Sequence, residues 1–117
     1  MRILFAFSFI LLMASCASIG IRDQGLELQI SPIPIERGKP ALAKINAPLN
    51  AQKVVGTILV FGSPELQFRK NEKEGLWYFY GTIPFSPWVK PGTYQVRVVS
   101  YLPNEKPHYT EMKVNLK

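Results

Sequence analysis

The prolines are the feature that most restricts how this chain can fold. All ten lie between residues 32 and 107. A proline lacks the backbone N–H and clashes with the preceding turn of a helix, so it interrupts helices and is excluded from the middle of a sheet. Prolines this frequent rule out long helices. They indicate short extended segments with turns roughly 8–12 residues apart.

Between the prolines, apolar and polar residues alternate with the period of two that is typical of β-strands. In the last such segment, Thr110, Met112, Val114 and Leu116 would share one face. Strand character is found at residues 26–30, 41–47, 54–61, 66–70, 76–83, 94–98 and 110–116. About seven short strands with this spacing predict an all-β fold, an immunoglobulin-like β-sandwich formed by residues 26–117.

The chain has 117 residues, of which 47% are hydrophobic, and this suffices for one small globular domain. Cys16 is the only cysteine, so the chain can form neither an internal disulfide nor a thiolate metal cluster. The domain must therefore be stabilised by packing.

The first sixteen residues, MRILFAFSFILLMASC, have the layout of an export signal. Arg2 supplies the positive charge, residues 3–13 are apolar apart from Ser8, and small residues follow. The apolar run is shorter than the ~20 residues that span a bilayer comfortably.

The residues Met13-Ala14-Ser15-Cys16 resemble the lipobox of bacterial lipoproteins, in which an apolar residue and two small residues precede a cysteine. In that chemistry the thiol is joined to diacylglycerol and the chain is cut before the cysteine. We therefore predict a lipoprotein signal peptide at residues 1–15, cleavage between Ser15 and Cys16, and fatty acyl chains such as palmitate on Cys16. Two alternatives remain, namely an ordinary signal cut after Ala17 and a retained N-terminal anchor.

Residues 16–25 would then form a lipidated tether. At about 3.3 Å per extended residue, the tether reaches at most about 30 Å, which keeps the domain close to the membrane. Two or more acyl chains give stable anchoring. In enterobacterial lipoproteins an aspartate after the cysteine retains the protein at the inner membrane. Ala17 occupies that position here, which favours the outer membrane if the cell is Gram-negative.

The net charge of +6 has two interpretations. It can reflect ordinary solubility, or attraction to an anionic surface such as phospholipid, lipopolysaccharide or a cell-wall polymer. The basic residues are scattered, and the pair Arg69-Lys70 is followed by Glu72 and Glu74. This pattern does not match a nucleic-acid footprint, so we expect no nucleic-acid partner.

Residues that could support catalysis are scarce. His108 is the only histidine and Asp23 the only aspartate, and Asp23 falls in the tether, so a Ser-His-Asp triad is not expected. Glu72 and Glu74 are interpreted as solvated loop residues, and His108 as solvated too. We expect no enzyme activity, no bound metal and no cofactor.

The two tryptophans have different predicted positions. Trp77 lies in a predicted strand, and we expect it in the core or at its edge. Trp88 lies in the loop at residues 84–90 together with Phe85. There it either caps the end of the sandwich or is an exposed contact for a partner, and Phe85 is a second candidate for that contact.

Five short motifs follow one another along residues 30–116. They are Ile30-Ser31-Pro32 with Gly38, Val55-Gly56-Thr57, Leu66-Gln67-Phe68-Arg69, Tyr80-Gly81-Thr82-Ile83-Pro84 and Pro91-Gly92-Thr93-Tyr94. In this order and spacing they resemble the immunoglobulin-like N-terminal domain of some lysostaphin-type murein endopeptidases. The resemblance implies that Tyr94 packs as a tyrosine corner. Those enzymes carry a zinc-binding catalytic domain after this module, and this chain ends at Lys117, so the resemblance implies no peptidase activity.

Together these features predict a non-catalytic, lipid-anchored binding module of the cell envelope that contacts an envelope protein or peptidoglycan. One alternative is a stand-alone regulator or docking module for a murein hydrolase. Another is a structural surface lipoprotein.

The lipid anchor can be tested by substituting its attachment site. We expect the Cys16→Ala protein to lose metabolic labelling with fatty acid and to leave the membrane fraction, because the thioether can no longer form. Continued retention in the membrane would instead support an uncleaved N-terminal anchor.

Overall fold

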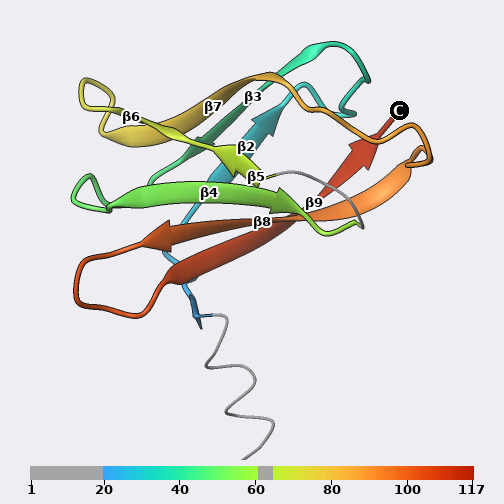
Figure 1. Cartoon of the computed structure of the whole chain (residues 1–117). Helices are drawn as coiled ribbons and strands as arrows, with labels where there is room; N and C mark the ends of the chain where they lie inside the picture. The colour runs from blue at the N-terminus through green and yellow to red at the C-terminus, as the bar shows by residue number, and fades with distance from the viewer. Residues whose placement is uncertain (1–19, 61–64) are drawn as a thin grey trace, which may run out of the picture.

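The computed structural model describes residues 20–60 and 65–117. The predicted signal peptide, Ser15, Cys16 and the first part of the tether lie outside these ranges. Within them the chain forms strands and turns, arranged as two sheets that face each other (Figure 1). This confirms the prediction of an all-β fold with the two layers of a sandwich.

Nine strands occupy the described residues. They are β1 (Ile21–Arg22), β2 (Leu28–Ser31), β3 (Pro40–Ile45), β4 (Lys53–Ile58), β5 (Glu65–Gln67), β6 (Arg69–Asn71), β7 (Leu76–Thr82), β8 (Gly92–Tyr101) and β9 (His108–Leu116). The first sheet has the order β1-β9-β8-β4-β5, and the second has the order β2-β3-β7-β6. Neighbouring strands are antiparallel except for β1, which runs parallel to β9.

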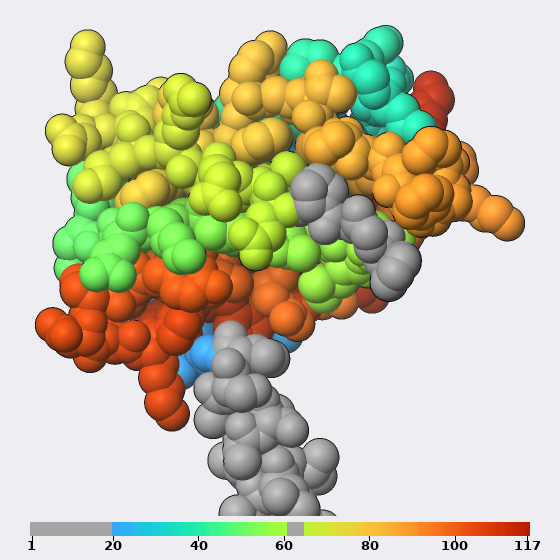
Figure 2. Space-filling view, viewed as in Figure 1, coloured from blue at the N-terminus to red at the C-terminus, as the bar shows by residue number. Residues whose placement is uncertain are grey.

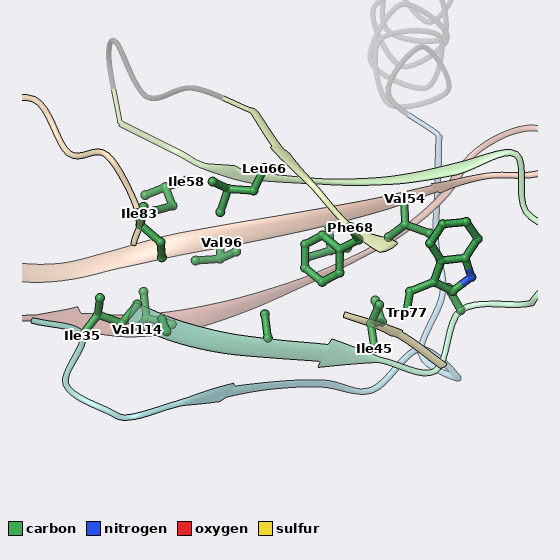
Figure 3. Packing of buried hydrophobic residues seen from close by; sticks show 14 of the residues in the cluster. Ile35, Ile45, Val54, Ile58, Leu66, Phe68, Trp77, Ile83, Val96 and Val114 are labelled. Carbon is green, nitrogen blue, oxygen red and sulfur yellow. The ribbon is translucent and has the colours of Figure 1, made fainter. Parts of the chain in front are cut away.

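The core lies between the sheets because alternate residues of each strand point inward. From the five-stranded sheet, Val96 and Val98 of β8 point into the core, and from the four-stranded sheet Ala43 and Ile45 of β3 do so. Figure 3 shows core side chains in the space between the strands, ten of them labelled. The labelled residues are Ile35, Ile45, Val54, Ile58, Leu66, Phe68, Trp77, Ile83, Val96 and Val114.

Trp77 of β7 belongs to this core, as its strand position predicts. Only 5% of its surface is exposed, and its indole Nε1 donates a hydrogen bond of 3.0 Å to the carbonyl of Pro48. The ring therefore fills one end of the core while its single polar atom is satisfied at the rim (Figure 3).

The predicted strand at residues 66–70 is in fact two strands in different sheets. Gln67 of β5 pairs with β4, whereas Arg69 of β6 pairs with β7. Phe68 lies between them, buried, and its backbone N–H donates to the carbonyl of Val54 at 3.0 Å. Leu66 and Phe68 both face the core, so the alternation continues across the change of sheet. This explains why the sequence pattern indicated one strand.

The predicted strand at residues 54–61 is shorter than expected, because β4 ends at Ile58. Val54 and Val55 point to opposite faces of the sheet, yet both are buried. On the outer face Val55 lies between Val99 and Gln67, its partners on the two neighbouring strands. The apolar run therefore reflects an inner strand whose outer face is covered by neighbouring side chains.

The tether differs most from its prediction. Residues 21 and 22 form β1 against the start of β9, and Leu26 is buried in the core. Gly20 has a φ of +103°, and a Cβ there would lie 2.5 Å from the carbonyl oxygen of Pro107. Only glycine fits this close approach. The second half of the predicted tether is therefore part of the folded domain.

Replacement of Ile45 by alanine tests the central role of this core. Ile45 is 1% exposed, and its side chain contributes to the contact between the sheets. We expect the Ile45→Ala protein to lose about 2–5 kcal/mol in free energy of unfolding, because the substitution leaves a cavity that surrounding residues fill only in part. Urea denaturation measures this loss. Leu59→Ala, at an exposed position, is the control and should change stability by less than about 1 kcal/mol.

Candidate functional site

The outer face of the four-stranded sheet carries two rows of side chains. In one row, Arg69 of β6, Tyr78 of β7 and Lys44 of β3 are register partners, with Gln29 of β2 at the end. In the next row, Tyr80, Leu42 and Ser31 are partners in the same way. Cross-strand partners have Cβ atoms about 5 Å apart, so each row is a continuous surface. We call the seven residues Gln29, Ser31, Leu42, Lys44, Arg69, Tyr78 and Tyr80 the tyrosine face.

Tyr80 is the most prominent member of the tyrosine face. Its side chain is 66% exposed in the middle of a strand. Tyr78, two residues earlier, is half-buried and points to the same side. Successive residues on one face of a strand lie about 7 Å apart, so two phenol rings are presented along β7.

Among the described residues, shallow hollows lie on and beside this face. One is lined by Gln67, Arg69, Tyr78, Phe79 and Tyr80, at the open edge formed by the change from β5 to β6. A second lies over β2 and β3 and includes Leu42 and Lys44. A third borders Lys44 and Leu76 toward one end of the sheet. Of these hollows, the first is lined by both tyrosines, and the other two lie over β2 and β3 and toward the end of the sheet.

Among the described residues, the space between the sheets does not provide a comparable site. Between the sheets, the described residues enclose an apolar void of about 20 Å³, bordered by Ala43, Gly56 and Phe68 among others. Such a void holds one water molecule at most, whereas small-molecule sites usually measure about 300 Å³ or more.

The two cations of the tyrosine face differ in their surroundings. The Nζ of Lys44 lies 3.4 Å from the Oε2 of Glu74. All eight carboxylate side chains of the chain lie in the described ranges, and none is within ion-pair distance of Arg69. The charge of Lys44 is thus partly compensated, and that of Arg69 is available to an external anion.

The two aromatic residues for which a partner contact was predicted both lie in the loop between β7 and β8, but they differ in exposure. Trp88 is 65% exposed, whereas Phe85 is half-buried and packs against the core. In the space-filling view this loop (orange) projects at the right, and the described N-terminal residues (blue) lie at the lower edge (Figure 2). Trp88 therefore stays a candidate contact, and Phe85 supports the loop from inside.

His108 is not the free, solvated residue that the sequence indicated. It begins β9, is half-buried, and its Nδ1 lies 2.9 Å from the Oδ2 of Asp23. The hydrogen bond with His108, followed by the one donated by the Gly25 backbone N–H, holds the pKa of Asp23 below its ordinary value of 3.8. This contact helps to hold the second half of the tether against β9.

Ser100 is the register partner of His108, so serine, histidine and aspartate side chains occur close together. The side chain of Ser100 is fully buried, and its hydroxyl has no hydrogen-bond partner among the described residues. A triad requires a serine bonded to the histidine and open to substrate. The arrangement therefore lacks both conditions for nucleophilic catalysis.

The two glutamates that were interpreted as loop residues lie in a loop. Glu72 and Glu74 lie in the exposed turn between β6 and β7, as expected of loop residues, and Glu74 pairs with Lys44. No cluster of three or more metal-ligating side chains occurs within the described residues. In the same part of the chain, no helix has the length and apolar character needed to cross a membrane.

The sequence signal for the tyrosine face is the alternation in LWYFYGT, which places Tyr78 and Tyr80 opposite Trp77 and Phe79. That pattern identifies two faces but does not reveal which of them meets the other sheet. The pairing with Arg69 depends on the change of sheet at Phe68, which no local pattern indicates.

Comparison with known proteins does not assign the chain to a family. No protein-family model matches it, and neither a curated protein nor a solved structure matches it.

The pair formed by Asp23 and His108 predicts a dependence of stability on pH. The pKa of Asp23 is lowered in the folded state, so the ionised carboxylate stabilises the fold. This stabilisation is fully present at pH values above the ordinary pKa of 3.8, and it is lost as the pH falls through the lowered pKa. We expect the wild type to be more stable than Asp23→Asn near neutral pH. The two stabilities should converge as the pH falls below 3.8 and through the lowered pKa, because the carboxyl then becomes protonated.

Urea denaturation over this pH range measures the effect. Glu72→Gln, which removes an exposed carboxylate without an ion pair, is the control and should show no such convergence. A stability difference between Asp23→Asn and wild type that stays constant at every pH would show that the charge of Asp23 contributes nothing to stability.

Proposed function

We propose that this chain is a non-catalytic, lipid-anchored module of the bacterial cell envelope that binds peptidoglycan on the tyrosine face. The observation that carries the proposal is the exposure of Tyr80 beside Tyr78 and Arg69 on an open sheet face. Export and acylation at Cys16, proposed from the lipobox-like sequence, would bring the domain to the compartment where this polymer is found.

The chemistry of the tyrosine face suits a sugar chain. The C–H faces of a pyranose ring are apolar and weakly positive, and they stack on the electron-rich face of a phenol ring. Tyrosine adds a hydroxyl for hydrogen bonding, and its rigid side chain loses little conformational entropy on binding. The amide of Gln67 lines the hollow beside the rings, and the amide of Gln29 lines the second hollow over β2 and β3. Both can bond sugar hydroxyls and acetamido groups.

The shape of the site also favours an extended ligand. The hollows over β6–β7 and over β2–β3 lie on either side of the central tyrosines, so a chain could cross the sheet from one to the other. A small molecule would be better served by a deep and enclosed site. An exposed, shallow face with aromatic residues at its centre is typical of recognition of a polymer or of another protein surface.

We further propose that the sandwich is immunoglobulin-like. If β1 is set aside, the order of the four-stranded sheet corresponds to strands A-B-E-D of that fold, and the order β9-β8-β4-β5 corresponds to G-F-C-C′. The hydroxyl of Tyr94, near the start of β8, donates a hydrogen bond to the carbonyl of Lys90, in the manner of a tyrosine corner. These two observations support the classification.

Binding to isolated peptidoglycan sacculi tests the proposed function. The purified protein in detergent should sediment with sacculi, and Tyr80→Ala should weaken this binding about tenfold, because it removes the central aromatic contact. Tyr80→Phe, which keeps the ring, should retain most of the affinity.

Trp88→Ala is the matched control, since it removes an equally exposed aromatic residue from a different surface. If Trp88→Ala lost binding and Tyr80→Ala kept it, the contact would lie in the loop between β7 and β8 instead. Failure of the wild-type protein to sediment with sacculi would contradict peptidoglycan binding altogether.

A further inference from the structure

We infer that Arg69 makes the tyrosine face selective for carboxylate-bearing peptidoglycan, by binding a carboxylate of the stem peptide while the tyrosines hold the sugar chain. This inference rests on the proposed function and specifies the part of the polymer that is recognised. Its basis is the position of Arg69 in the hollow shared with Gln67, Tyr78 and Tyr80.

The first support is the charge of this hollow. Its lining has one guanidinium, one amide, two phenols and the phenyl ring of Phe79, and no carboxylate. None of the eight carboxylate side chains of the chain forms an ion pair with Arg69, although the acidic residues Asp23, Glu36, Glu74 and Glu111 each pair with a basic residue elsewhere. The guanidinium is therefore a cation without a counter-ion in the described chain, beside the most exposed tyrosine.

The second support is the geometry of the edge. Arg69 begins β6, a strand of three residues at the edge of its sheet, and no other strand formed by the described residues covers its outer side. Because β5 and β6 lie in different sheets, Gln67 and Arg69 meet at the open side of the sandwich. A ligand that lies across Tyr78 would therefore reach Arg69 at the edge of the sheet. There the guanidinium can contact the ligand from the side.

The third support is the chemistry of a guanidinium and a carboxylate. A guanidinium presents a planar fork of donors that binds a carboxylate with two parallel hydrogen bonds. The sugar backbone of peptidoglycan carries acetamido and hydroxyl groups, and the free carboxylates belong to its stem peptides. A neutral glycan would satisfy the tyrosines but would leave Arg69 without its partner.

The test compares native sacculi, stripped of attached proteins and secondary polymers, with the same sacculi after chemical amidation of their carboxyl groups. We expect amidation to weaken binding of the wild-type protein about tenfold, as the loss of one charged bidentate contact implies. Arg69→Gln should bind native sacculi about tenfold more weakly and lose nothing further on amidation. Arg69→Lys, which keeps the charge and loses the fork, should fall between these two.

Lys106→Gln is the control for non-specific attraction, because it removes the same charge from the exposed turn between β8 and β9. It should bind both preparations like the wild type. Unchanged thermal unfolding of Arg69→Gln would show that its fold is intact.

Three results would overturn the inference. If wild-type protein binds native and amidated sacculi equally well, or if Arg69→Gln behaves like Lys106→Gln on both, the carboxylate is not recognised, and peptidoglycan binding through the tyrosines still stands. If neither preparation is bound, the proposed function fails and the selectivity fails with it.

Discussion

The structure depends on the packing of alternate side chains between two sheets. Cys16 is the only cysteine, so no disulfide joins the sheets, and no metal-binding cluster is present in the described part of the chain. The inward residues of each strand must therefore supply the stabilising free energy by removing apolar surface from water. Trp77, Phe68 and Ile45 are large contributors to this core. Because the inner faces are committed to packing, the outer faces remain free to carry a binding surface.

The same alternation explains how much the sequence could predict. Inward residues such as Val96 and Val98, or Val114 and Leu116, repeat every second position, and this repeat correctly located most strands. The repeat does not report which sheet a strand joins. Residues 66–70 therefore looked like one strand, and the meeting of Gln67 with Arg69 could not be foreseen. β1 has only two residues, which is too short for any periodic signal.

Contacts between distant parts of the chain were the least predictable. Asp23 and His108 are 85 positions apart, and neither has a local pattern that points to the other. Their pairing requires both the parallel alignment of β1 with β9 and the folded positions of the strands between them. The tyrosine face had a partial signal, because Tyr78 and Tyr80 alternate with Trp77 and Phe79 in β7. The position of Trp88 in a loop left two alternatives, a cap on the end of the sandwich or an exposed contact, and its exposure of 65% agrees with the second.

The docking of residues 20–23 on β9 has a consequence for how far a lipid-anchored domain could move. A free tether from Cys16 to Gly25 would span about 30 Å. If the chain is held from Gly20 onward, the free part of the tether spans only about 13 Å. A shorter tether confines the domain to a smaller volume above the bilayer and raises its effective concentration for any polymer within that volume. Part of the orientational entropy otherwise lost on binding would already have been given up on folding. The hydrogen bond between Asp23 and His108 would then act on the range of the domain as well as on its stability.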